Sequence, residues 1–261
     1  MIIAGFGATV GTMYTFPTSM MEDDHAATRP PIVQTLPMTG GVRDVRGNAR
    51  NPRAAQLIGK SFIVAQYTDP WVTLGTALDA LRAATIAIGK TKLWALMRDG
   101  TYRWTWAKCV YFRAPEKVGQ IHHCPVSLKF KVADSVWYSE AAHTGALVAW
   151  SNALTNAGNV ATPVKVSLMA VTAACTAFEF RNSDGVNRVS FAGSVVAGKV
   201  FVIDSLKRSA KNDGTAAYAG MTIVGSGAWL SLPAGVSGIT WQSSAGGAPT
   251  AAYEFYDAWV M

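Results

Sequence analysis

The residues of this chain that could do chemistry are few, and their spacing does not favour a metal site. The densest group is His122-His123-Cys124. Neighbouring side chains on a strand point to opposite faces, so these two imidazoles could not easily bind the same ion. The other histidines, His25 and His143, have no ligand spacing. The sequence therefore predicts no metal ligands and no cofactor.

The carboxylates of the last third do not predict catalysis. A glycosidase or other depolymerase would need two carboxylates facing each other across a cleft. Asp184 and Asp213 each precede glycine, which is typical of turns, and Ser226 lies in Gly225-Ser-Gly227, another turn. The chain has no G-x-S-x-G, P-loop or H-E-x-x-H motif. We predict no catalytic residues and no enzyme activity, although that third holds six acids: Glu179, Asp184, Asp204, Asp213, Glu254 and Asp257.

Two stretches are better suited to contacts with other proteins. Four arginines, Arg43, Arg46, Arg50 and Arg53, lie in a stretch rich in Gly, Asn and Pro, which predicts a loop. Trp104 and Trp106 alternate with Arg103 and Thr105 and should share one face of a strand. Arginine and aromatic side chains make the strongest interface contacts, so we predict a protein interface at these six positions. Nucleic-acid recognition by the arginine loop would need interleaved aromatics or a known module, and neither is present there.

The composition indicates a protein that assembles with others. Hydrophobic residues make up 50% of the 261 positions and charged residues only 15%, against roughly 25% charged in an ordinary soluble domain. An isolated chain would have few charged side chains to cover its surface. We therefore expect much of the surface to lie against other subunits. The net charge is +7, of which +6 belongs to residues 1–144 and +1 to residues 145–261.

Cysteine usage and hydropathy indicate a protein that folds in a reducing cytosol. The three cysteines, Cys109, Cys124 and Cys175, cannot all pair and none forms a CxxC motif, so we predict free, buried thiols. The first eleven residues have no Lys or Arg and contain three glycines, unlike a secretory signal. No apolar run approaches the roughly 18 residues of a membrane span, so no membrane insertion is expected.

The periodicity of the first half predicts strands and one helix. Residues 2–6, 13–16, 61–67 and 124–132 have strand character. The apolar positions Leu74, Leu78, Leu81, Thr85 and Ile88 recur every three or four residues, which predicts a helix that ends at Gly89. Asp99-Gly100 separates two alternating segments, 92–98 and 101–112, and predicts a hairpin with a two-residue type I′ turn.

The last third, from Asn152 onwards, has two-residue periodicity throughout. Val164, Val166 and Leu168 should face a core while Lys165 and Ser167 face away. Further segments at 200–204, 229–232 and 253–259 are separated by Gly, Asn and Asp turns. This spacing predicts an antiparallel β-sandwich.

The order of the motifs resembles the siphophage tail-component family, the distal tail proteins of long-tailed bacteriophages. Their C-terminal domain is galectin-like. In this chain the resemblance rests on Val202-Ile-Asp204, on Asp213-Gly214 and on the turns between the strands of the last third. It also rests on an aspartate followed by a Trp-Tyr pair, here Asp134 and Trp137-Tyr138, although the family's proline after the aspartate is Ser135 here. The longer motifs are Asn156-Ala-Gly-Asn159, Ala161-Thr-Pro163, the run from Trp229 to Gly235, and the run from Tyr253 to Trp259.

The resemblance implies a mainly β protein of two domains. Residues 1–144 would form a ring-forming, β-barrel-like N-terminal domain with one α-helix, and residues 145–261 a galectin-like sandwich. The implied function is a structural hub at the phage tail tip, within the virion and assembled in the host cytoplasm. A homohexameric ring would join the tail tube protein to the tail-tip hub or tail-associated protein, to the tape-measure protein and to a receptor-binding protein. DNA would meet it only in transit through the lumen.

A carbohydrate-binding module is the alternative, because galectin-like sandwiches can stack an aromatic ring on a sugar. Trp229 and Trp241 are the candidate carbohydrate contacts. The discriminating feature would be an exposed aromatic side chain beside convergent polar groups on the C-terminal domain.

Overall fold

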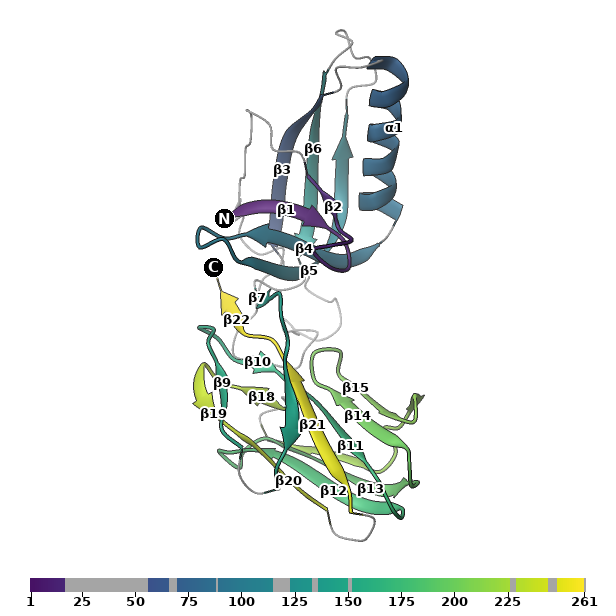
Figure 1. Ribbon diagram of the computed structural model, residues 1–261, viewed down its shortest axis with the longest axis vertical. Helices are drawn as coiled ribbons and strands as arrows, with labels where there is room; N and C mark the ends of the chain where they lie inside the picture. Colours follow the sequence, from purple (N-terminus) through teal and green to yellow (C-terminus); the bar gives the residue numbers. More distant parts are fainter. Residues whose placement is uncertain are drawn as a thin grey trace, which may run out of the picture. The chain divides into compact units, whose positions relative to one another are not determined.

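The computed structural model describes residues 1–16, 56–65, 70–87, 89–114, 123–132, 136–149, 152–225, 229–243 and 248–260. These residues belong to two compact units (Figure 1). The division falls between Glu140 and Ala141, and the second unit continues to Val260. The arginine loop, Asp134 and the His122 position lie outside the described residues.

The first unit is an antiparallel sheet with one helix, in agreement with the predicted mainly β fold. Its strands follow the order β2-β1-β4-β5-β6-β3. The long strand β5 pairs with β4 along one edge, and with β7 and then β6 along the other. The elements are β1 (Ile2–Phe6), β2 (Tyr14–Thr15), β3 (Gln56–Ala65), α1 (Pro70–Arg82), η1 (Ala83–Ala87), β4 (Lys90–Leu96), β5 (Tyr102–Arg113), β6 (His123–Val132) and β7 (Val136–Ser139).

The predicted helix is present. It runs as α1 and continues through one π-helical turn, η1. Leu81 is fully buried in the core of the first unit, and Leu78 packs against the same core. Within the described residues no helix is long and apolar enough to cross a membrane.

The hairpin between β4 and β5 is present, but its turn is not the predicted type I′. Gly100 has φ of 81°, whereas Asp99 is absent from the residues with positive φ, so the two residues do not both adopt the left-handed conformation. The Gly100 N–H donates to Met97 O (3.1 Å), and the Met97 N–H donates to Thr101 O (2.8 Å). This pattern is a three-residue loop that ends on a left-handed glycine. Asp99 Oδ1 stabilises it by accepting from the Thr101 N–H and hydroxyl.

The core of the first unit lies on one face of the sheet, where the helix also packs. Leu128, Phe130 and Val132 of β6 point into it, together with Leu93 of β4 and Ala107 of β5. The thiols of the chain are free and buried, as predicted. Burial raises the pKa of both Cys109 and Cys124, which keeps these thiols protonated and unreactive.

The second unit is a sandwich of two antiparallel sheets, as predicted. One has the order β16-β15-β14-β11-β21-β8 and the other β17-β13-β12-β20; β10-β18 and β19-β9 form two short pairs. The strands are β8 (His143–Leu147), β9 (Leu154–Asn156), β10 (Thr162–Pro163), β11 (Lys165–Met169), β12 (Cys175–Asn182), β13 (Arg188–Val195), β14 (Val200–Asp204), β15 (Ser209–Asn212), β16 (Thr215–Ala216), β17 (Met221–Val224), β18 (Ser231–Leu232), β19 (Gly235–Ser237), β20 (Ile239–Ser243), β21 (Thr250–Phe255) and β22 (Ala258–Val260).

The core between the two sheets is rich in phenylalanine. Val166 and Leu168 of β11 are fully buried, as their alternation predicted. Phe178, Phe191 and Phe201 pack with ring centroids 4.4–5.5 Å apart, within the range of favourable aromatic pairs. This core fixes the position of the outer face of the β17-β13-β12-β20 sheet.

Candidate functional site

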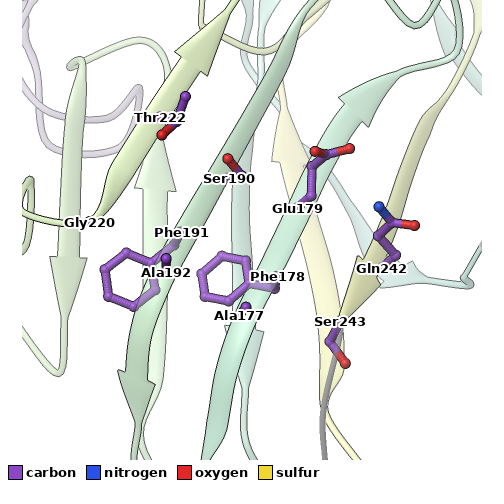
Figure 2. Close-up of a pocket in the computed structure, with 10 residues that line it drawn as sticks. All are labelled: Ala177, Phe178, Glu179, Ser190, Phe191, Ala192, Gly220, Thr222, Gln242 and Ser243. Atoms are coloured by element: carbon purple, nitrogen blue, oxygen red, sulfur yellow. The ribbon is translucent and has the colours of Figure 1, made fainter.

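The outer face of the second unit's smaller sheet carries one row of polar side chains across four strands. Thr222 pairs with Ser190, Ser190 with Glu179, and Glu179 with Gln242. Each of these residues alternates with a core residue on its strand, so its side chain points away from the sandwich interior. Figure 2 shows them on neighbouring strands. The register therefore brings a carboxylate, an amide and two hydroxyls together.

A pocket of about 400 Å³ lies along this row. The adjoining row consists of small residues: Ala177 pairs with Ala192, whose N–H donates to Gly220 O. Because these residues have at most a methyl side chain, they leave a hollow beside the larger polar groups (Figure 2). Every described lining residue except Gly220, which lies in the turn before β17, belongs to a strand of this sheet.

Glu179 gives the pocket its charge. Its Oε1 lies 2.7 Å from Arg181 Nη2, and its Oε2 lies 4.0 Å from Arg188 Nη1. The Glu179 side chain is 16% exposed, and Oε1 is buried without a well-aligned hydrogen bond. A buried acceptor of this kind is stabilised by an added donor. A ligand rich in hydroxyl groups could supply that donor and accept hydrogen bonds from the arginines and Gln242.

The lining of this pocket does not suit acid–base catalysis by paired carboxylates. Among the described lining residues Glu179 is the only acid. Paired-carboxylate hydrolysis needs a second one across a cleft. Within the described part of the chain, no group of three or more His, Cys, Asp and Glu side chains could hold a metal ion.

The first unit has a different surface, which we call the lysine face. It comprises Lys90 and Lys92 on β4, Lys108 on β5, and Lys129 and Lys131 on β6. These side chains alternate with core residues and point to the opposite side of the sheet. Lys108 pairs directly with both Lys90 and Lys131, which places three lysines in one row across three strands.

Aromatic rings lie among these lysines. Lys92 Nζ is 4.2 Å from the ring centroid of Trp104, and Lys90 Nζ is 5.8 Å from that of Trp106. Lys129 Nζ is 5.1 Å from the Tyr111 ring. Such cation–π contacts hold the ammonium groups close to the sheet.

The tryptophans predicted to contact other molecules lie in different environments. Trp104 is 1% exposed and packs against Trp94, Trp106 and Tyr138, and its indole N–H donates to Ser139 O (2.8 Å). Its side chain therefore belongs to the packing of the first unit, whereas Trp106 is only half-buried.

The predicted sugar contacts do not line the pocket. Trp241 is 9% exposed and donates its indole N–H to Leu147 O (3.0 Å) inside the sandwich. Trp229 is partly buried against the same core. Neither belongs to the pocket lining, and the two aromatic residues among the described lining residues, Phe178 and Phe191, are buried.

The polar row and the lysine face were not predicted as sites. The sequence presents Glu179 only as one of the six acids of the last third, and no motif marks Ser190, Thr222 or Gln242. Alternation indicates that these residues point outward, but only the strand order shows that they form one row. The excess positive charge of residues 1–144 was the available signal for the lysine face.

This chain is similar to known proteins in its fold but not in its sequence. No family model and no curated protein matches the chain. Among solved structures it is similar to the Dit protein of phage SPP1, described as a paradigm of the hub of the adsorption apparatus in phages that infect Gram-positive bacteria. The TM-score is 0.56 with 13% identity, over 78% of this chain and 79% of that one. The baseplate of phage P2 in its activated, Ca-bound conformation gives a TM-score of 0.44 with 9% identity, over 77% and 78% of the two chains.

Proposed function

We propose that this chain is a structural protein of a phage tail tip that forms a hub between the tail tube and the proteins that recognise the host. The observation that carries this proposal is the fold likeness to SPP1 Dit, which extends over more than three quarters of both chains. A match of that extent includes residues of both units. Function does not follow from fold alone, but the motifs that resemble distal tail proteins lead independently to the same assignment.

We infer that the hub is a homohexameric ring made by the N-terminal units. The low charge of the chain supports extensive burial between subunits. A repeated head-to-tail interface closes into a ring and leaves two different surfaces, one above and one below. These would contact the tail tube protein on one side, and the tail-associated and receptor-binding proteins on the other. The lumen would admit the tape-measure protein and then DNA, and the ring would reside in the virion.

The mass of the purified protein in solution tests the ring. Light scattering over a concentration series should give a discrete hexamer, or a trimer that doubles on concentration, and electron microscopy should show closed rings. A chain that stays monomeric at every concentration and also fails to bind the end of purified tail tubes would contradict the proposal.

A second candidate function, carbohydrate binding by the second unit, is favoured by the pocket on the outer face of β12 and β13. Its polar row offers the donors and acceptors that sugar hydroxyls need. The described lining residues include no exposed aromatic ring, so binding would rest on hydrogen bonds to Glu179, Gln242 and the adjoining arginines.

A glycan array with the full chain tests this second function. Specific binding should be lost in Glu179→Gln. It should persist in Glu254→Gln, which removes an acid from a different ion pair, with Lys165 (2.7 Å), outside the pocket lining. Failure of the wild-type chain to bind any glycan, or equal loss in both variants, would exclude the pocket as a sugar site.

A further inference from the structure

We propose that the lysine face of the first unit binds the phosphate backbone of nucleic acid without regard to sequence. The first observation is the row formed by Lys90, Lys108 and Lys131. Neighbouring strands lie about 5 Å apart, so the three charges fall within a span of about 10 Å. Like charges placed directly opposite one another destabilise a sheet. An anionic ligand bound over this row would offset the repulsion among the three lysines.

The second observation is that Lys90, Lys108, Lys129 and Lys131 form no ion pair with any carboxylate of the described residues. The strands β4, β5 and β6 contain neither Asp nor Glu. Two of the acids described elsewhere in the first unit are matched to other cations: Asp79 lies 3.9 Å from Arg82, and Asp99 lies 3.9 Å from Arg103. Lys108, Lys129 and Lys131 are all exposed. The face therefore presents a strong positive potential to solvent.

The type of cation favours phosphate over a protein partner. Protein interfaces are enriched in arginine and depleted in lysine, because arginine pairs with carboxylates in a fixed two-pronged geometry. A field of lysines acts as a set of point charges, which suits the closely spaced phosphates of a nucleic acid. The rings of Trp106 and Tyr111 hold two of the ammonium groups near the sheet, so less side-chain freedom is lost on binding.

This inference goes beyond the hub and does not depend on it. DNA binding and ring formation are measured independently on the same chain, so the two proposals can fail separately. Binding of this kind is sequence-independent and weakens steeply with salt.

Fluorescence anisotropy with a labelled mixed-sequence DNA duplex tests the proposal on the full chain. The logarithm of the binding constant should fall linearly with the logarithm of the salt concentration. In Lys108→Gln with Lys131→Gln the slope should be smaller by about 2, about 1 for each lysine removed. The control, Lys207→Gln with Lys211→Gln, removes the same charge from exposed positions of the second unit and should keep the wild-type slope.

Three results would overturn the proposal. One is no binding of the duplex by the wild-type chain at low salt. Another is an equal decrease of the salt slope in the two double variants, which would show that binding depends only on net charge. The third is binding of poly-glutamate that DNA does not displace, which would assign the face to an acidic protein. Thermal melting checks that the variants fold, and removal of lysines from a repulsive row should not lower stability.

Discussion

Asn156 and Asp257 exchange hydrogen bonds reciprocally across the second unit. Asn156 Oδ1 accepts from the Ala258 N–H (3.3 Å), while Asp257 Oδ1 accepts from the Ala157 N–H (2.8 Å). Each side chain thus satisfies the backbone donor of the residue that follows the other. The two segments lie about a hundred positions apart in sequence, and this pair joins the end of β9 to the start of β22.

Asn156→Ala should destabilise the second unit strongly. The side chain is fully buried, and its Nδ2 also donates to Val160 O (2.8 Å), so the variant leaves several buried backbone groups without partners. We expect the free energy of unfolding to fall by about 2–4 kcal/mol, measured by urea denaturation.

Asn159→Ala is the matched control for this prediction. Asn159 makes a similar pair of hydrogen bonds with the backbone of Val260, but at an exposed site where water can replace them. Its loss should cost less than about 1 kcal/mol. Similar losses in the two variants would show that the buried exchange adds no special stability.

Lys131→Glu should stabilise the first unit although it removes a positive charge from the lysine face. The new carboxylate would lie directly opposite Lys108 and convert a repulsive cross-strand pair into an attractive one. The expected gain is about 0.5 kcal/mol in the free energy of unfolding, with Lys131→Gln between the two. A lower melting temperature for Lys131→Glu would show that the row is not under electrostatic strain.

Sequence reasoning predicted most of the fold because its signals are local. The alternation of Val164, Val166 and Leu168 and the three- to four-residue spacing of apolar positions from Leu74 to Ile88 depend only on near neighbours. The same reasoning misplaced the type I′ turn. Such a turn is found at Asp213-Gly214, where φ is 49° and 81°, whereas Asp99 accepts hydrogen bonds from Thr101 and leads into a longer loop.

The candidate sites were much less predictable, because both depend on which strands become neighbours. Glu179 and Gln242 lie far apart in sequence and meet only through the β12–β20 register. Lys108 and Lys131 meet through the pairing of β5 with β6. Trp241, a predicted sugar contact, lies in the sandwich core, because burial of a large apolar ring is favourable.

Stability at alkaline pH should depend on Tyr256. Burial, together with the nearby Glu254 and Asp204 carboxylates, raises the pKa of Tyr256 above its ordinary value of 10.0 and outweighs the opposing effect of Lys165. The folded state therefore favours the neutral phenol. The stability that this gives is fully present below pH 10 and is lost as the pH rises through the raised pKa.

Tyr256→Phe should reduce that alkaline loss, measured as the change in urea midpoint between neutral pH and pH above 10. Tyr14→Phe provides the comparison, because burial also raises the pKa of Tyr14 but this residue lies in the first unit. If the two units unfold separately, each variant should alter only its own transition. An unchanged pH dependence in Tyr256→Phe would show that this phenol does not govern the alkaline transition.

The arginine loop is the remaining untested candidate for an interface, and charge reversal there separates assembly from folding. Arg46→Glu with Arg50→Glu should weaken ring closure or docking to the tail tube, because the introduced glutamates would repel partner carboxylates that the arginines are predicted to pair with. The melting temperature of the isolated subunit should stay close to that of the wild type if the arginines act only in assembly, since surface ion pairs contribute little to folding. Lys207→Glu with Lys211→Glu makes the same change in net charge on the second unit and should assemble normally. Unchanged ring mass and tube binding in the arginine variant would remove the loop from the interface and leave Trp106 as the predicted contact to test next.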